Sequence, residues 1–300
     1  MRRVVVTGVG LVSSLGTGVE KTWEALLKGE TGIKLIESFD TEDLAVKMAG
    51  VVDDFNPEDF GIDKKELKKL ARFSQFGIAA SKMALDDSGL IIDENNAERI
   101  GVIVSSGIGG LDVFEEQHIN LVDKGAKRVS AFTIPAMIAN MSSGNISIYL
   151  GAKGPNKTIV TACAAGTHSV GDAFELIKHG RADAMVAGGT EACISKFCVA
   201  GFNNMTALSR NSENYKKSSR PFTIDRDGFV MGEGAGVVIL EEYESAKARG
   251  AKIYAEMVGY GETGDAHHMT APASGERAGA VRAIKMALEE GGIDPTEVDY

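Results

Sequence analysis

The segment KTIVTACAAGTHSV, residues 157–170, decides how this chain is expected to fold. Residues 158–162 form a short, largely apolar and β-branched run, which is typical of a strand. Beyond Cys163, apolar side chains recur at helical spacing, at Val170, Ala173, Phe174 and Ile177. The pattern therefore predicts a strand, a tight turn and a helix, with a thiol at the turn.

Cys163 is the candidate nucleophile of this segment. The aligned peptide dipoles of a helix favour the thiolate form of a cysteine at its N-terminus. The small residues that follow, Ala164, Ala165 and Gly166, let the chain bend sharply and leave the sulfur reachable, as in the elbow of serine hydrolases. The alternative is a small buried hydrophobic residue, which is what most free cysteines are.

The other two cysteines, Cys193 and Cys198, are interpreted as structural. They lie five residues apart, with no nearby histidine or third thiol at metal-binding spacing, so we expect no metal site. Three cysteines form at most one disulfide, which indicates reduced thiols and a cytoplasmic location.

The composition describes a globular chain of 300 residues, 44% of them hydrophobic and 25% charged. Lys and Arg number 32 against 42 Asp and Glu, and the resulting net charge of −10 argues against general binding to nucleic acid. No apolar stretch approaches the roughly 20 residues of a membrane-spanning helix, so we expect no membrane insertion.

Outward from the elbow, short apolar runs alternate with helix-length segments. The runs predict strands over residues 4–9, 99–105, 184–187, 236–240 and 253–258. Amphipathic segments predict helices over residues 19–28, 241–249 and 278–290. The alternation indicates a layered α/β fold, with a boundary near Gly250 that divides the chain into units 1–250 and 251–300. The second unit looks unfinished.

A basic run crosses this acidic chain at Lys64, Lys65, Lys68, Lys69 and Arg72. Its helix-like spacing gathers the positive charges on one side, and Lys124, Lys127 and Arg128 form a second small group. A solvated helix face is the commoner meaning of such a run. Because the rest of the protein is acidic, we favour a surface that steers an anionic partner.

Histidines offer weaker candidates. His267 and His268 form an adjacent pair in a loop-like stretch before Pro272, which is either a site or a solvated turn. His168 follows Cys163 by five residues, and we expect it to pack or cap rather than to act as a base.

Several motifs, in order along the whole chain, carry a resemblance to a known family. Residues 154–170 resemble the active-cysteine motif of the β-ketoacyl-acyl-carrier-protein synthases. Residues 1–10 resemble the family's opening strand, 106–110 its acyl-pocket glycine turn, 220–236 the signature before its central strand, and 264–272 a further matching loop. The resemblance is closest to the elongating type II enzymes.

This resemblance implies a thiolase-like α-β-α-β-α fold, complete in its N-terminal half and incomplete in its C-terminal half. It also implies a homodimer that performs the decarboxylating Claisen condensation of an acyl thioester with malonyl-acyl-carrier protein, a step of fatty acid elongation. Cys163 would hold the acyl group as a thioester. Phosphopantetheine would arrive on the carrier protein, so no separate cofactor is expected.

The same resemblance assigns further residues. Ile108 would line or gate the acyl pocket, and Thr270 and His268 would bind the substrate arm. Acyl carrier proteins are small and acidic, and the residues expected to dock them are Lys64, Lys65, Lys68, Lys69, Lys127 and Arg128.

One departure from the family pattern bears on activity. The family's two catalytic histidines, its lysine and its second oxyanion donor correspond to positions beyond Tyr300, and none of the five histidines present matches them by motif. We therefore expect these 300 residues, if assayed alone, to be impaired in condensation.

Two other functions fit parts of the sequence. An NAD(P)-dependent dehydrogenase is suggested by residues 4–10 and by the spacing of Tyr149 and Lys153, but Ser13 stands where a third glycine is required and Gly154-Pro155 would break the helix. A non-catalytic partner resembling a chain-length factor keeps the fold and loses the thiol, and the presence of Cys163 counts against it.

Overall fold

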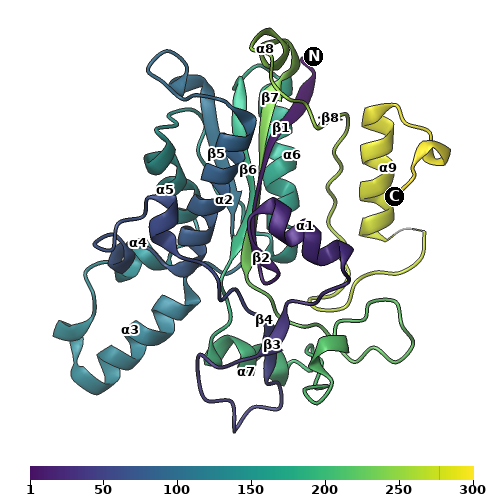
Figure 1. Ribbon diagram of the computed structural model, residues 1–300. Coiled ribbons are helices and arrows are strands. Elements are labelled where there is room, and N and C mark those ends of the chain that lie inside the picture. The colour runs from purple at the N-terminus through teal and green to yellow at the C-terminus, as the bar shows by residue number, and fades with distance from the viewer. Residues whose placement is uncertain (277) are drawn as a thin grey trace.

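Over residues 1–276 and 278–300, which the computed structural model describes, the chain folds around a six-stranded sheet (Figure 1). The strand order is β2-β1-β7-β6-β5, and β8 pairs with β1 outside this path. Its strands are β1 (Val4–Ser13), β2 (Gly16–Thr17), β5 (Ile100–Ser105), β6 (Ala184–Glu191), β7 (Gly234–Glu242) and β8 (Ala255–Met257). β5 and β6 run parallel, and the other pairs of this sheet run antiparallel.

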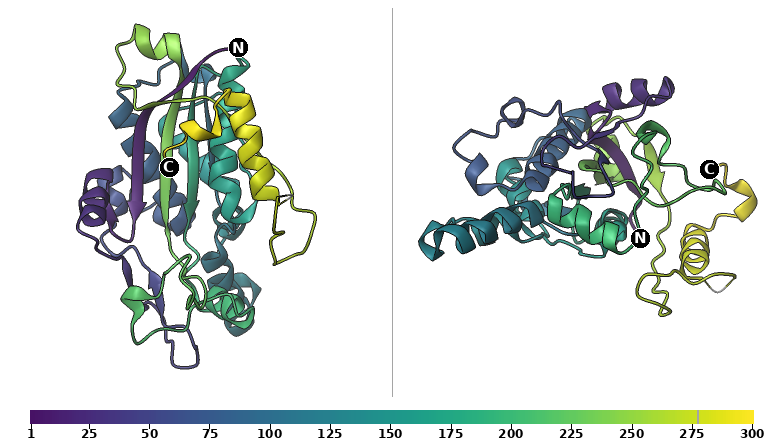
Figure 2. Two further views of the ribbon diagram at one scale, coloured as in Figure 1. Left: turned by 90° about the vertical axis from the view of Figure 1, so that its right-hand side faces the viewer. Right: turned by 90° about the horizontal axis from the view of Figure 1, so that it is seen from below.

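Helices cover both faces of the sheet. On one face lie α2 (Arg72–Ser88) and α5 (Met141–Leu150), and on the other lies α6 (Ala165–Lys178) (Figures 1 and 2). The strands predicted over residues 4–9, 99–105, 184–187, 236–240 and 253–258 are confirmed; the first, third and fourth are longer than predicted, and the second and fifth are shorter. The result is one complete α-β-α sandwich.

The remaining elements connect and flank this sandwich. They are α1 (Val19–Leu27), β3 (Ile33–Leu35), β4 (Met48–Gly50), α3 (Leu111–Lys124), α4 (Thr133–Met137), α7 (Lys196–Asn204), α8 (Tyr243–Ala248) and α9 (Gly279–Gly291). β3 and β4 form a separate two-stranded ribbon, and α3 projects from the body (Figure 1). No helix in the described part of the chain is both long and apolar enough to cross a membrane.

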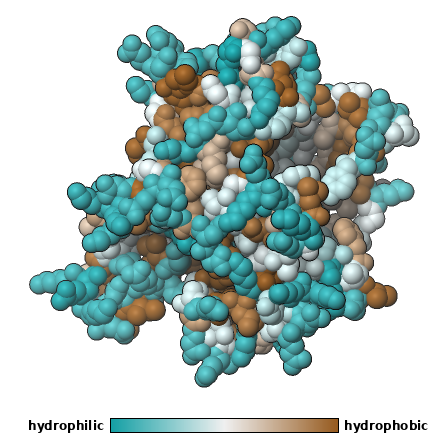
Figure 3. Space-filling view, in the orientation of Figure 1, coloured by the Kyte–Doolittle hydropathy of each residue, from teal (hydrophilic) through white to brown (hydrophobic). Residues whose placement is uncertain are grey.

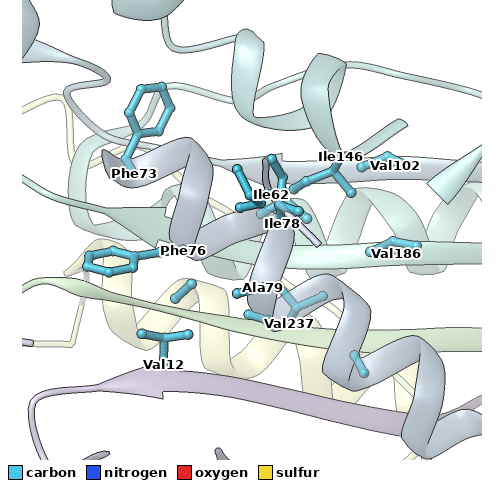
Figure 4. Close-up of a cluster of buried hydrophobic side chains, with 14 of the residues drawn as sticks. Val12, Ile62, Phe73, Phe76, Ile78, Ala79, Val102, Ile146, Val186 and Val237 are labelled. Atoms are coloured by element: carbon cyan, nitrogen blue, oxygen red, sulfur yellow. The ribbon is translucent and has the colours of Figure 1, made fainter. Parts of the chain in front are cut away.

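The larger core lies between α2, α5 and the sheet. Phe73 and Phe76 are buried one helical turn apart on α2, and Ile78 gathers with Ile146 and Val102 further along (Figure 4). A second core, on the α6 face, is formed by Phe174 and Ile177 against strand residues. Burial of such side chains contributes about 1.5–3 kcal/mol each relative to exposure.

Gly8 and Gly10 of β1 make the contact with α2 close. A Cβ placed on Gly10 would lie 1.9 Å from the carbonyl oxygen of Ala80, and one on Gly8 would lie 2.1 Å from that of Ala84. These glycines therefore serve strand-to-helix packing inside a strand, rather than a dinucleotide phosphate loop. Tyr149 also lies in the last turn of α5, which ends at Leu150, so the dehydrogenase alternative lacks its helix.

The strand predicted over residues 158–162 is wrong. The segment runs beside β5, but side chains take the place of a regular ladder: the Ile159 amide donates to Ser105 Oγ at 2.9 Å, and the Val104 amide to Ser143 Oγ at 3.0 Å. Backbone pairing with β5 is made by the preceding residues 154–157, where the Val102 amide donates to the Pro155 carbonyl and the Lys157 amide donates to the Val102 carbonyl. An extended chain without successive backbone pairs is not a sheet strand.

The helix expected through residues 64–72 is also wrong. The segment contains a short 3₁₀ helix, Leu67–Lys69, and α2 begins only at Arg72. Leu70 is buried in the core next to this turn, so burial of one apolar side chain overrides the helical spacing of the lysines.

Residues 251–300 lie against the sandwich. The chain leaves β8, passes α6 and returns as α9 (Figures 1 and 2). A Cβ on Gly261 would lie 2.0 Å from the carbonyl of Ala283, and one on Gly171 would lie 2.2 Å from the Tyr260 ring. The segment that follows β8 thus packs closely against both α9 and α6. The division of the chain at Gly250 remains a prediction.

The face of the molecule shown in Figure 3 is mainly hydrophilic, with apolar side chains in separate patches. Among the exposed large apolar residues of the chain are Trp23, Ile148, Val160 and Phe222.

Candidate active site

Cys163 lies at the turn that the sequence predicts. It is in the short 3₁₀ helix Ala162–Ala164, which leads directly into α6, and its side chain is exposed. Ala162 has a φ of 52°, a left-handed conformation that is uncommon for a residue with a Cβ. Strained backbone of this kind clusters at functional sites.

Three hydroxyl groups hold the elbow in place. Ser105, the last residue of β5, accepts hydrogen bonds at Oγ from the Ile159 amide and from the Ser169 hydroxyl on α6. Thr161 Oγ1 and His168 Nδ1 are hydrogen-bonded at 2.8 Å. The segment before Cys163 and the helix after it are therefore both tied to fixed groups, and His168 packs beside the elbow as expected.

A cavity of about 560 Å³ opens beside the thiol. It lies where β5 and β6 end, because their parallel pairing brings Ser105 and Gly189 to the same edge of the sheet. Its lining includes Cys163, Ile108, Glu191, Cys193, Phe202 and Glu233. The structure thus brings together Cys163 and Ile108, which the sequence places more than 50 residues apart.

Glu191 is a site residue that the sequence analysis missed. Its Oε1 accepts a hydrogen bond from Ser106 Oγ at 2.7 Å and its Oε2 one from the Gly107 amide at 2.8 Å. Burial raises the pKa of this carboxyl, and those hydrogen bonds offset part of the effect. The available signal was an acidic residue at the end of the apolar run 184–190, where a buried strand meets the site.

Glu233 is a second carboxylate in the cavity wall, and it is paired. Arg72 donates to it through Nε at 3.1 Å and through Nη2 at 2.9 Å, and the Val52 amide donates at 3.0 Å. The Glu233 side chain is only 5% exposed. Arg72, expected on the basic face, therefore neutralises a buried carboxylate instead.

The docking candidates lie in two short turns. Lys64 pairs with Glu58 and Lys69 with Glu66, while Lys65 and Lys68 are exposed. Lys127 and Arg128 are exposed in the 3₁₀ helix Ala126–Arg128 that follows α3.

Phe132 brings these two turns together. The Lys69 ammonium lies 5.7 Å from the Phe132 ring centroid, and Lys68 and Ser130 line one surface pocket. Ser130 lies two residues after Arg128 in the chain, so a short segment connects the second basic group to this pocket.

His268 and Thr270 lie in an exposed loop outside the lining of the Cys163 cavity. His268 Nδ1 accepts hydrogen bonds from the Thr270 and Ala271 amides, both at 3.2 Å. Asp265 organises the same loop by accepting from the amides of Ala273 and Gly279, and these bonds lower its pKa. The assignment of His268 and Thr270 to substrate binding remains a prediction.

Cys193 and Cys198 are buried, in keeping with a structural role. A hydrogen bond with Cys198, together with burial, raises the pKa of the Cys193 thiol, so Cys193 is a poor nucleophile although it lines the cavity. Within residues 1–276 and 278–300, no three metal-binding side chains come together.

An α-β-α sandwich with an exposed thiol at a tight turn, next to a cavity at the strand ends, defines the class of thiolase-like condensing enzymes. Comparison with known proteins identifies the family within this class. Residues 1–246 match the β-ketoacyl synthase N-terminal domain, and residues 254–300 match the β-ketoacyl synthase C-terminal domain. The chain belongs to the β-ketoacyl synthase family and is a condensing acyltransferase.

Two relatives illustrate the similarity in sequence. The chain is 52% identical over 299 residues to 3-oxoacyl-[acyl-carrier-protein] synthase 2 of Staphylococcus aureus (strain COL), covering 100% of this chain and 72% of the relative. It is also 52% identical over 299 residues to the protein of the same name from Synechocystis sp., covering 100% of this chain and 71% of the relative.

Solved structures agree in fold. A β-ketoacyl synthase from Burkholderia phymatum superposes with a TM-score of 0.91 at 34% identity, covering 100% of this chain and 73% of the other. A structure described as a type II polyketide synthase acyl carrier protein in complex with its ketosynthase has a TM-score of 0.89 at 33% identity. The match covers 100% of this chain and 72% of the other. The structure of the ishigamide ketosynthase/chain length factor has a TM-score of 0.88 at 37% identity, covering 99% of this chain and 72% of the other.

Proposed function

We propose that Cys163 accepts an acyl group from a carrier thioester in the elongation of fatty acids. The thiolate attacks the thioester carbonyl, the acyl–cysteine bond forms, and the carrier leaves with its thiol restored. The observation that carries the proposal is the exposed thiol at a strained turn beside a 560 Å³ cavity that also holds Ile108. The Cys163 amide at this turn would donate to the thioester oxygen.

Condensation follows in a second step. Malonyl-acyl-carrier protein loses carbon dioxide, the resulting carbanion attacks the acyl–cysteine carbonyl, and 3-oxoacyl-carrier protein leaves as the Cys163 thiol is restored. The family's histidines, which would stabilise the enolate, are not matched within these 300 residues. The prediction of impaired condensation is tested by measuring carbon dioxide release from malonyl-carrier protein with this chain and with a C-terminally extended version; equal rates would refute it.

Acyl transfer is tested by mass spectrometry after incubation with a long-chain acyl-carrier protein. We expect one acyl adduct, on the peptide that contains Cys163, and none in Cys163→Ala. Cys193→Ser is the matched control and should still be acylated, because Cys193 is buried and its thiol resists ionisation. Absence of an adduct from the unaltered protein would favour the non-catalytic, chain-length-factor-like alternative.

We further propose that the two adjoining basic groups dock an acyl carrier protein. One structural relative is described as a ketosynthase in complex with an acyl carrier protein, and in this chain Lys69 of the first group lies over Phe132, four residues after Arg128 of the second. A concentrated positive surface on a protein of net charge −10 suits a small acidic partner.

The docking surface is tested by reversing Lys65 and Lys69 to Glu. We expect the Michaelis constant for acyl-carrier protein to rise about tenfold or more, while transfer from acyl-CoA changes little, because only the carrier contacts this surface. The control is Lys285→Glu, the same kind of charge reversal at one exposed position of α9. An equal loss with both donors would contradict docking at these turns.

We also propose a homodimer. Ile134, Ile148 and Val160 are exposed near the β5 edge of the sheet, where the segment 158–162 runs without a regular ladder. An exposed extended edge with apolar side chains is a surface that proteins normally cover.

A further inference from the structure

The inference concerns Glu191 and the glycine turn Ser106–Gly110 that carries Ile108. One carboxylate organises this turn: its two oxygens accept from Ser106 Oγ and from the Gly107 amide, and Ser106 Oγ in turn accepts from the Gly109 amide at 2.8 Å. Removal of the carboxylate would leave Ser106 and Gly107 without their shared acceptor. Hydrogen bonds to an ionised acceptor are roughly twice as strong as neutral ones.

The turn fits closely between Glu191 and the elbow. A Cβ on Gly107 would lie 3.0 Å from Glu191 Oε2 and 3.1 Å from the carbonyl oxygen of Ala162, the residue before the nucleophile. A shift of the turn would therefore press on the elbow or withdraw from it. Ile108 follows Gly107 directly and lines the cavity with Cys163.

The two carboxylates of the cavity wall have different partners. Glu233 is held by the guanidinium of Arg72, whereas Glu191 is held by a hydroxyl and a backbone amide of the turn. Glu233 thus fixes the wall to α2, and Glu191 fixes the turn to the end of β6.

We propose that Glu191 is a positioning residue that holds Ile108 at a set distance from Cys163 and thereby determines which acyl chains fit beside the thiol. It acts through the turn Ser106–Gly110. The inference rests on the proposed acyl transfer to Cys163, and it assigns the chain-length selectivity of that same site.

Variants at Glu191 separate positioning from simple charge. Glu191→Ala removes both acceptors. Glu191→Gln keeps the shape and one acceptor, but its amide group is a donor and cannot replace the second acceptor. If the turn depends on two acceptors, the acyl-chain selectivity of Glu191→Gln should lie between that of the unaltered protein and that of Glu191→Ala. Ser106→Ala removes the hydrogen-bond donor to Glu191 Oε1 and should change the acyl-chain selectivity in the same direction as Glu191→Ala.

Alkyl methanethiosulfonates probe the pocket without enzyme turnover. The Cys163 thiolate attacks the sulfenyl sulfur, a disulfide forms, and methanesulfinate leaves. We measure second-order rates with the methyl and octyl reagents, with peptide mapping to confirm Cys163. The octyl-to-methyl rate ratio should exceed that of free cysteine in the unaltered protein. It should fall about three- to tenfold in Glu191→Ala, which removes both hydrogen bonds between the turn and this side chain, and less in Glu191→Gln.

Glu94→Ala, an exposed carboxylate on the surface, is the matched control and should keep the original ratio. An unchanged ratio in both Glu191 variants, or an original ratio no higher than that of free cysteine, would overturn the proposal. Should Glu191→Ala fail to fold by circular dichroism, Glu191→Gln and Ser106→Ala decide the question. The reagents need no carrier, so a missing acyl adduct refutes the proposed function without affecting this test.

Discussion

Asp183 accepts hydrogen bonds from two guanidinium groups that belong to distant parts of the chain. Arg99 donates through Nε at 2.9 Å and Nη2 at 2.8 Å, and Arg2 donates through Nη1 at 2.7 Å. Arg99 and Asp183 directly precede β5 and β6, and Arg2 lies two residues before β1, so one carboxylate links the starts of three strands. The bonds from Arg99, joined by those from Arg2, lower the pKa of Asp183 to about 2.

This shift predicts a pH-dependent contribution to stability. Because the folded-state pKa lies below the ordinary value of 3.8, the contribution is complete above about pH 4 and is lost as the pH falls toward 2. Asp183→Asn should therefore lower the free energy of unfolding by about 1 kcal/mol at pH 7, since the group is 40% exposed and solvent screens it. Urea titrations of both proteins at several pH values should show the difference shrinking below pH 4; a difference that grows on acidification would contradict the account.

Residues of similar chemistry and sequence context have different partners and exposure in the structure. Arg72 and Lys68 lie four residues apart in one basic run, yet Arg72 neutralises Glu233 at the cavity wall and Lys68 is exposed. Cys163 and Cys193 both line the cavity, but only Cys163 has an exposed side chain. Side-chain chemistry alone therefore does not assign these roles, because exposure and partner decide them.

At the scale of elements, β1 packs on α2 with little space between their backbones. Gly8 and Gly10 let the helix backbone approach the strand, and α2 carries Phe73 and Phe76 into the core. The position of α2 also fixes Arg72 and, through it, Glu233. The geometry of one strand-to-helix contact is thus transmitted to the wall of the active-site cavity.

Gly10→Ala tests this contact. The added methyl group would lie 1.9 Å from the Ala80 carbonyl oxygen, which is helix backbone and cannot move aside cheaply. We expect a loss of about 3 kcal/mol or more in the free energy of unfolding, measured by urea titration, because overpacking forces backbone shifts. Gly201→Ala is the control: its Cβ meets nothing within 4 Å inside α7, so stability should rise by about 0.5–1 kcal/mol. Equal effects at both positions would refute the packing argument.

At the scale of the whole molecule, the cavity of Cys163 lies at the strand ends, and the proposed dimer surface lies along the β5 edge. The docking turns lie beside α2 and after α3. Ile134 of the proposed dimer surface lies two residues after Phe132, so the surfaces proposed for a carrier protein and for a second subunit adjoin each other.

The dimer is tested by Ile148→Glu. Ile148 is 73% exposed on α5, and a charge there should oppose burial against a second copy. In analytical ultracentrifugation we expect the unaltered chain at twice the mass of one chain and the variant mainly as a monomer. Ile91→Glu, at a 76% exposed position in a loop, should leave the mass unchanged. A monomeric unaltered chain at micromolar concentration would exclude the dimer.

The sequence by itself determined the layered α/β fold, most strands, the helix after Cys163 and the family. Periodicity and the elbow motif are local, so they are readable from neighbouring residues. Local patterns failed at residues 158–162, where Ser105 and Ser143 replace a backbone ladder, and at residues 64–72, where burial of Leu70 overrides helical spacing.

Only the tertiary structure decided what surrounds the thiol. Glu191 is the last residue of β6 and Glu233 directly precedes β7, while their partners, Ser106 and Arg72, come from other parts of the chain. Such pairings arise where strand ends converge, and no spacing along the chain encodes them. The sequence shows which residue can carry the acyl group, and folding sets the walls around it, because the cavity exists only where distant segments meet.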